Sequence, residues 1–201
     1  MAQVNPVVGD IDGNAALITD AVGKSLTHSV DVVVFPEMVL TGYPVEDLAL
    51  RPAFRSASIN RLKSLATELK SIGADKTLVL VGYLDEGEKP LNSLALIYGG
   101  AVVAKYTKRH LPNYGVFDEF RNFGPGEGTL VVRYKGVDIA VAICEDIWID
   151  QGPVSKLSER KPGLVLVPNG SPFERSKEDV RQQLVRKRAM DIGAPLVYTN
   201  M

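Results

Sequence analysis

Residues 31–37 read DVVVFPE, an apolar run that closes on a proline and a glutamate. A run without alternating polar residues predicts a strand that is buried on both faces. Pro36 marks the end of this strand because proline has no backbone N–H for a sheet hydrogen bond. Residues 77–84, TLVLVGYL, form a second run of the same kind. Both runs indicate a sheet that is covered by helices.

The other strand candidates are short apolar runs, at residues 93–98, 101–106, 130–134, 137–144, 163–169 and 194–200. Only Gly99 and Gly100 separate the first two of these runs, which is typical of a two-residue hairpin turn. Lys135 and Gly136 separate the next two in the same way. Hairpins placed among buried strands predict mixed sheets.

Helical patterns fill the gaps, at residues 14–28, 51–72 and 176–192. Asn14 is the expected cap of the first helix, and Gly73 ends the second. Ser176, with Asp179 three residues later, resembles a capping box for the third. Strands that alternate with helices predict an α/β layer fold, and no linker or repeat divides the chain. We therefore expect one domain.

The composition excludes several classes of function. The formal net charge of -1 gives no general attraction to nucleic acid or to an anionic membrane. No apolar run approaches the ~20 residues that span a bilayer, and the N-terminus does not read as a signal peptide, so we expect a cytoplasmic protein. The single cysteine and the two histidines lie far apart, without metal-ligand spacing. The basic cluster from Arg181 to Arg188 fits the solvated face of a helix.

Reactive side chains stand at three strand ends. Glu37 closes the first apolar run, Lys108 follows the run at 101–106, and Cys144 ends the run at 137–144. Functional groups collect beyond the carboxyl ends of strands in α/β sheets. Taken singly, these residues also fit ordinary roles, as a solvated carboxylate, a surface lysine and an inert core thiol.

Together they supply what thiol attack on an amide requires. A carboxylate can take the thiol proton, and a cation can stabilise the thiolate. Glu145 and Asp146 follow Cys144 directly, so their charges would repel a thiolate unless a lysine offset them. Lys108 and the backbone amide of Glu145 are candidate donors to the oxyanion of a tetrahedral intermediate. Aromatic residues in the charged loop at 115–127 indicate that this loop packs over another part of the protein.

Five strings carry a family resemblance: AQVNPVVGDIDGN at 2–14, FPEMVLTGYPVEDL at 35–48, KRHLPNYGVFDEFRNF at 108–123, ICEDIW at 143–148 and PNGSPF at 168–173. With them the chain resembles the nitrilase superfamily of carbon–nitrogen hydrolases over its whole length. Within that superfamily it looks like the glutaminase domain of glutamine-dependent NAD synthetases. The resemblance implies an αββα sandwich and one carbon–nitrogen hydrolase domain over residues 1–201.

The resemblance also implies roles for individual residues. Glu37 is implied as general base, Lys108 as stabiliser of the oxyanion and the thiolate, Cys144 as nucleophile, and Glu119 as the support of the lysine. The implied lining of a glutamine pocket consists of Tyr43, Tyr114, Phe117, Glu145, Trp148, Ser171 and Lys177. In that pocket Glu145 suits the α-ammonium group of glutamine, whereas Lys177 and Ser171 suit its α-carboxylate.

The implied reaction is glutamine hydrolysis through a cysteine thioester, with ammonia passed to a synthetase domain that converts deamido-NAD to NAD. That domain would use ATP and Mg. No cofactor is expected in this segment, since the glycine-rich residues 124–128 contain a proline and lead into a strand, unlike a phosphate-binding loop. Members of the family begin several residues earlier and continue with further strands. We therefore expect a chain truncated at both ends and lacking the synthetase domain. Assembly into a homo-oligomer is also implied.

Two alternatives remain open from the sequence. One is a stand-alone hydrolase of the same superfamily that acts on another amide, a nitrile or a carbamoyl group. The other is an inactive fragment or interaction module, for which a broken set of catalytic residues would be the sign.

Overall fold

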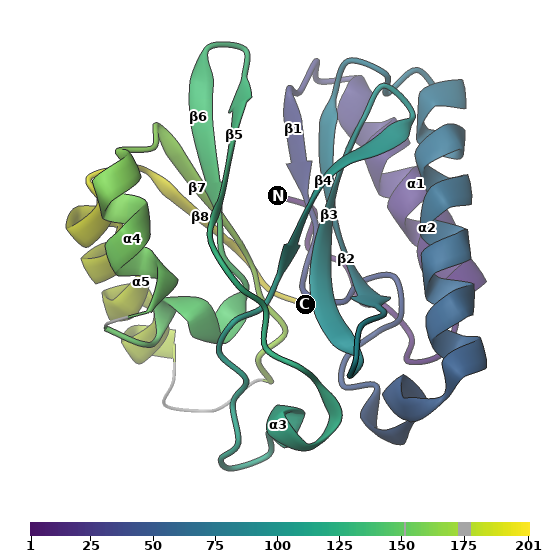
Figure 1. Cartoon of the computed structure of the whole chain (residues 1–201). Helices are drawn as coiled ribbons and strands as arrows, with labels where there is room; N and C mark the ends of the chain where they lie inside the picture. The colour runs from purple at the N-terminus through teal and green to yellow at the C-terminus, as the bar shows by residue number, and fades with distance from the viewer. Residues whose placement is uncertain (151, 173–177) are drawn as a thin grey trace.

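The computed structural model describes residues 1–150, 152–172 and 178–201. These residues form two four-stranded sheets with the strand orders β1-β2-β3-β4 and β5-β6-β7-β8. The sheets lie next to each other in the middle of the molecule, and helices cover their outer faces (Figure 1). The layers confirm the predicted αββα sandwich.

The first sheet contains β1 (Val32–Val34), β2 (Leu78–Asp85), β3 (Leu91–Tyr98) and β4 (Ala101–Thr107). β1 and β2 are parallel, and the other two pairs are antiparallel. Gly99 and Gly100 have φ values of 63° and 87°, which a two-residue hairpin turn requires and which glycine adopts without strain. The predicted hairpin is therefore confirmed.

The second sheet contains β5 (Leu130–Tyr134), β6 (Val137–Val141), β7 (Leu164–Pro168) and β8 (Leu196–Thr199). β5 and β6 form the second predicted hairpin, and β6, β7 and β8 run in parallel. The strand expected over 137–144 ends earlier, at Val141. Cys144 instead begins a short 3-10 helix, η2 (Cys144–Ile147).

Helices of the first half are α1 (Ile11–Leu26), the 3-10 helix η1 (Glu46–Leu50), α2 (Pro52–Ser71) and the single turn α3 (Glu119–Asn122). Those of the second half are α4 (Pro153–Arg160) and α5 (Glu178–Ile192). α1 and α2 cover the first sheet, and α4 and α5 cover the second (Figure 1). None of the described helices has both the length and the apolar character that a membrane span requires.

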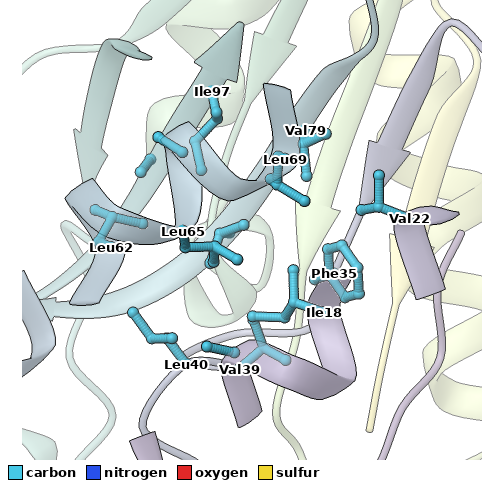
Figure 2. Close-up of a cluster of buried hydrophobic side chains, with 14 of the residues drawn as sticks. Ile18, Val22, Phe35, Val39, Leu40, Leu62, Leu65, Leu69, Val79 and Ile97 are labelled. Carbon is cyan, nitrogen blue, oxygen red and sulfur yellow. The ribbon is translucent and has the colours of Figure 1, made fainter. Parts of the chain in front are cut away.

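Apolar layers join these elements. Figure 2 shows Leu62, Leu65 and Leu69 of α2 packed with Ile18 of α1 and Phe35 after β1. A second cluster fills the space between the sheets and unites side chains of both, namely Val34, Leu78, Leu80, Leu94, Leu96, Tyr106, Ile139, Val141, Ile143, Cys144 and Leu166. Because Cys144 belongs to this cluster, its backbone is fixed by the packing of the two sheets.

The N-terminal cap of α1 differs from the prediction. Asp10, not Asn14, caps α1, since its carboxylate accepts from the Gly13 N–H at 2.9 Å. Asn14 is buried and bonds both backbone groups of Val7 at 2.8 Å. The capping box proposed at Ser176 lies outside the described residues. α4 was not predicted, because its sequence carries only one turn of buried apolar residues.

The basic cluster from Arg181 to Arg188 is not uniformly solvated, contrary to the prediction. Arg188 is 2% exposed, and its guanidinium donates to the carbonyls of Ile147 and Trp148. It also pairs with Asp150 at 2.7 Å. These bonds satisfy the C-terminal carbonyls of η2, which a helix cannot satisfy itself. Arg188 thereby anchors the short helix that carries Cys144.

Asp146 anchors the other side of η2. Its fully buried carboxylate accepts from the Tyr106 hydroxyl at 2.8 Å and from the backbone N–H of Ile143 at 3.1 Å. It also accepts from the backbone N–H groups of Arg109 and His110, at 3.1 and 2.9 Å. One carboxylate therefore ties the start of η2 to the segment that follows Lys108.

We predict that Asp146→Asn lowers the free energy of unfolding by about 3 kcal/mol, because an amide nitrogen would face donors that now meet an oxygen in a buried site. Urea denaturation followed by circular dichroism measures this loss. Asp138→Asn is the matched control, since Asp138 forms an exposed pair with Arg133 and should cost less than about 1 kcal/mol. Equal losses in both variants would contradict the anchoring role.

Candidate active site

Strand ends from both sheets bring the three predicted side chains to one place. Glu37 follows β1, Lys108 follows β4, and Cys144 lies beyond β6. All three are buried, with exposed fractions of 1%, 0% and 3%. The Lys108 Nζ lies 2.7 Å from Glu37 Oε1, and the charges of both residues act on the Cys144 thiol. The structure therefore assembles the set that the sequence predicted.

A tight turn after β1 sets the direction of Glu37. The residue that follows it, Met38, has a φ of 49°, and Gly82 of β2 lies against the turn. A Cβ at Gly82 would stand only 2.3 Å from the Met38 nitrogen, so this approach requires a glycine. The Glu37 N–H donates to the carbonyl of Asn169 at 3.2 Å, which joins the turn to the second sheet.

The carboxylate of Glu37 has one occupied and one free oxygen. Oε1 accepts from Lys108 Nζ at 2.7 Å and from Asn92 Nδ2 at 2.8 Å. Oε2 has no hydrogen-bond partner within the part of the chain that the structure describes. An ideal Cβ at Gly170 would stand 3.1 Å from this oxygen, so Oε2 faces the backbone of that glycine. A free, buried carboxylate oxygen is ready to accept a proton.

Lys108 forms the centre of an ion cluster. Its ammonium also donates to Glu119 Oε1 at 2.8 Å, which leaves its third N–H for another acceptor. Burial by itself lowers the pKa of Lys108, but the charges of Glu37, Cys144 and Glu119 outweigh burial, and the pKa lies well above its ordinary value. The side chain is therefore a permanent cation.

Glu119 lies in α3, inside the loop that the sequence expected to pack over another part of the protein. The loop does so: Glu119 is 3% exposed, and Phe123 is buried beside Leu84 and Met38. The Tyr43 hydroxyl donates to Glu119 Oε1 at 2.8 Å. Burial raises the pKa of Glu119, with a contribution from Glu37, although Lys108 opposes the rise.

Cys144 lies at the first position of η2 with a φ of 44°, a left-handed backbone that a side chain adopts only under constraint. Its Sγ is 3.9 Å from the Ser171 hydroxyl, and it interacts with the backbone N–H of Gly170. Burial and the charge of Glu37 raise the pKa of the thiol well above its ordinary value, while Lys108 lowers it. The resting residue is therefore a neutral thiol near the carboxyl group of Glu37.

The two acids after Cys144 differ in their surroundings. Asp146 accepts bonds from the Lys108 side of the site, as described above. Glu145 accepts from the Tyr114 hydroxyl at 2.9 Å, and burial raises its pKa. The repulsion expected from two acids beside the thiol is thus reduced, because four hydrogen bonds already hold the charge of Asp146.

Two neighbouring cavities divide the predicted substrate residues. A cavity of about 610 Å³ is lined by Tyr43, Phe117, Gly170, Ser171, Arg181 and Asn200, among others. A second cavity of about 340 Å³ includes Tyr114 and Glu145. The rings of Tyr114 and Phe117, one from the lining of each cavity, meet edge to face at 5.7 Å, so the two cavities adjoin.

The two other predicted pocket residues are not among the described lining residues. Trp148 packs against the apolar cluster beneath α4 and α5. Lys177 lies outside the residues that the structure describes. Among the described residues, no group of three or more His, Cys, Asp or Glu side chains could hold a metal ion.

Several site residues escaped the sequence reasoning. Asn92 sits in the apolar strand β3 and contacts Glu37, and an isolated amide in such a run was the available signal. Arg181 was assigned to a solvated face, yet it lines the larger cavity. Asn169 and Gly170 lie inside the string PNGSPF, of which only Ser171 had been singled out.

The family model for carbon-nitrogen hydrolases matches residues 1–201. The curated glutamine-dependent NAD(+) synthetase of Thermotoga maritima is 37% identical over 203 residues, which are 100% of this chain and 34% of that protein. The enzyme of the same name from Xanthomonas campestris is 38% identical over 205 residues, which are 100% of this chain and 36% of that protein. This chain therefore spans about a third of the length of the curated relatives it matches.

Solved structures agree. A glutamine-dependent NAD+ synthetase from Acinetobacter baumannii superimposes with a TM-score of 0.90 at 34% identity, over 100% of this chain and 37% of that chain. A nitrilase-superfamily amidase from Nesterenkonia has a TM-score of 0.82 at 25% identity, over 98% of this chain and 73% of its own. One variant of that amidase carries the acetamide moiety of fluoroacetamide on its active-site cysteine. With a family match over its whole length and this cluster of side chains, the chain belongs to the carbon–nitrogen hydrolase family.

Proposed function

We propose that this chain hydrolyses the side-chain amide of glutamine, as the ammonia-supplying part of a glutamine-dependent NAD synthetase. The observation that carries the proposal is a neutral thiol beside a carboxylate with one free oxygen and a fixed ammonium. The similarity to glutamine-dependent NAD synthetases supports glutamine as the substrate. The ATP- and Mg-dependent amidation of deamido-NAD belongs to the remainder of such a protein. On the family resemblance we also propose that the protein assembles into a homo-oligomer.

The first half of the reaction forms a thioester. Glu37 Oε2 takes the Cys144 proton as the sulfur attacks the amide carbon of glutamine. The C–O double bond becomes an oxyanion, towards which the third N–H of Lys108 is available. The backbone N–H groups at the start of η2 are further donors, since the first turn of a helix leaves them without internal partners. The proton on Glu37 then passes to the amide nitrogen, and ammonia leaves.

The second half regenerates the thiol. Glu37, ionised again, takes a proton from water, and the hydroxide equivalent attacks the thioester carbon. The C–S bond breaks, glutamate leaves, and the proton on Glu37 returns to the sulfur. The sum is glutamine and water to glutamate and ammonia. Lys108 keeps its proton throughout, because its pKa lies well above the ordinary value.

Charges at the rim of the cavities suit the amino-acid end of glutamine. Arg181 lines the larger cavity, where its Nη2 donates to the Pro172 carbonyl and its buried Nε has no hydrogen-bond partner among the described residues. We assign to it a role in binding the α-carboxylate, as an addition to Lys177. Glu145, with a charge of opposite sign, suits the α-ammonium group. Trp148, by contrast, is proposed only on the family resemblance.

A second candidate is a stand-alone amidase, which the similarity to the Nesterenkonia amidase favours. It uses the same attack on an amide. A small aliphatic amide would then be a better substrate than glutamine, and Arg181 in the lining of the larger cavity would have no charged group to bind.

Cys144→Ala should reduce ammonia release from glutamine to the background rate, because no other thiol exists in the chain to form the thioester. A coupled ammonia assay on the full-length protein, as its gene encodes it, measures the rate. A thermal midpoint close to that of the unchanged protein shows that the fold is kept. Near-normal ammonia release by the variant would overturn the assignment of Cys144.

Glu37→Gln should shift the alkylation of Cys144 to lower pH while it removes hydrolysis. The negative charge of Glu37 raises the pKa of Cys144, so its loss lowers that pKa and leaves Lys108 to stabilise the thiolate. Hydrolysis should fall about 10²- to 10⁴-fold because the base is gone. The rate of iodoacetamide labelling against pH measures the shift. Glu68→Gln, at the surface, is the control, and an unchanged or higher labelling midpoint in Glu37→Gln would contradict this electrostatic link.

Arg181→Met should raise the KM for glutamine about 10- to 100-fold with a smaller effect on kcat, because a charged hydrogen bond contributes about 1.5–3 kcal/mol. Small amides without a carboxylate should be cleaved equally by both proteins. Arg186→Met is the matched control, since Arg186 is an exposed residue of the same helix. A KM for glutamine that does not change would contradict the role of Arg181.

A further inference from the structure

Asn92 contacts two members of the ion cluster. Its side chain is 1% exposed, and its Nδ2 donates to Glu37 Oε1 at 2.8 Å. Its backbone carbonyl accepts from the Lys108 N–H at 2.9 Å. One residue of β3 therefore fixes the Glu37 carboxylate through its side chain and Lys108 through its main chain.

These contacts determine which oxygen of Glu37 is free. Asn92 and Lys108 both donate to Oε1, whereas Oε2 has no partner in the described parts of the chain. Oε2 is the oxygen next to Gly170, whose backbone N–H interacts with the Cys144 thiol. The oxygen without donors thus lies beside the glycine that also borders the nucleophile.

We propose that Asn92 is a positioning residue, which holds the Glu37 carboxylate so that Oε2 stays free to take the proton of Cys144. The inference rests on the proposed chemistry of Glu37 and Cys144, but not on the identity of the substrate. Asn92 acts through Glu37.

The chemistry of the amide suits this role. With Lys108 as the sole donor, the carboxylate could rotate and share both oxygens with the ammonium, which would leave no free acceptor for the thiol. An amide N–H₂ prevents this rotation without adding a charge to a buried cluster, where a further ion would be costly. The opposite orientation of the amide would place Asn92 Oδ1 against Glu37 Oε1, where two acceptors repel. Its nitrogen must therefore face the base.

Two substitutions separate positioning from the filling of space. Asn92→Leu keeps the approximate volume and removes the donor. Asn92→Asp keeps the shape almost unchanged but places an oxygen against Glu37 Oε1. If Asn92 only filled space, Asn92→Asp would keep the activity of the unchanged protein. Asn92→Leu would then lose more activity than Asn92→Asp. If it positions Glu37, both lose activity, and Asn92→Asp loses more.

The experiment measures kcat and KM for glutamine and the rate of Cys144 alkylation by iodoacetamide, in the protein at its naturally encoded length. For Asn92→Leu we expect kcat to fall roughly 10- to 100-fold, a part of what a general base contributes, with KM within about 3-fold. Alkylation should slow in parallel, because Glu37 keeps the charge that raises the pKa of the Cys144 thiol but no longer takes its proton. Glu37→Gln differs because it removes that charge. Asn14→Leu is the control: Asn14 is equally buried but bonds only backbone groups, so this variant should lose stability and keep both rates.

Three outcomes would overturn the proposal: unchanged kcat in Asn92→Leu, near-normal kcat in Asn92→Asp, or alkylation that stays at the normal rate while kcat falls. Failure of the unchanged protein to release ammonia from glutamine is a different result. It would count against glutamine as the substrate, and the alkylation rates of the variants would still test Asn92. Thermal midpoints identify a variant that has lost its fold, in which case the other substitution decides.

Discussion

A lysine ammonium between two buried carboxylates is the interaction on which this site depends. Removing three charged groups from water costs several kcal/mol for each ion, and close pairing must offset that cost. Lys108 lies within 2.8 Å of an oxygen of both Glu37 and Glu119, and the Tyr43 hydroxyl and the Asn92 amide add hydrogen bonds to the same oxygens. Every charge in the cluster therefore has a partner. Burial, together with the charge of Glu37, raises the pKa of the neighbouring Cys144 thiol and keeps it protonated at rest.

The fold maintains this geometry with supports that lie outside the ion cluster. Cys144 belongs to the apolar layer between the sheets, and the residues after it form a 3-10 helix with a buried charge bound at each end. Asp146 bonds the N–H groups of the segment after Lys108, while Arg188 bonds the carbonyls at the end of η2. Hydrogen bonds thus tie the segment of the nucleophile to the segment of the lysine. In the same way, the bond from Glu37 to the Asn169 carbonyl links the base to the second sheet.

The features that the sequence could predict are those with a signal in neighbouring residues, whereas contacts between distant segments leave no such signal. Both hairpins were predictable, because Gly99-Gly100 and Lys135-Gly136 are local turn signals. Glu37, Lys108 and Cys144 were predictable as strand-end residues and through the family resemblance. From the residues alone Asp146 and Glu145 could not be told apart, since they are adjacent acids whose directions follow from the left-handed backbone of Cys144, and only the family resemblance singled out Glu145. Arg188 and Arg181 looked like surface charges, because the carbonyls and the cavity that they meet come from distant segments.

The central claim is that Lys108 is a permanent cation, held by its two carboxylates. Proton-detected ¹⁵N NMR of lysine side chains, with Lys108→Met to assign the signal, tests it directly. The account predicts that the Lys108 signal remains that of an ammonium group at and above pH 10.5, the ordinary pKa of lysine. A Lys108 side chain that loses its proton well below that pH, as an unpaired buried lysine does, would contradict the account.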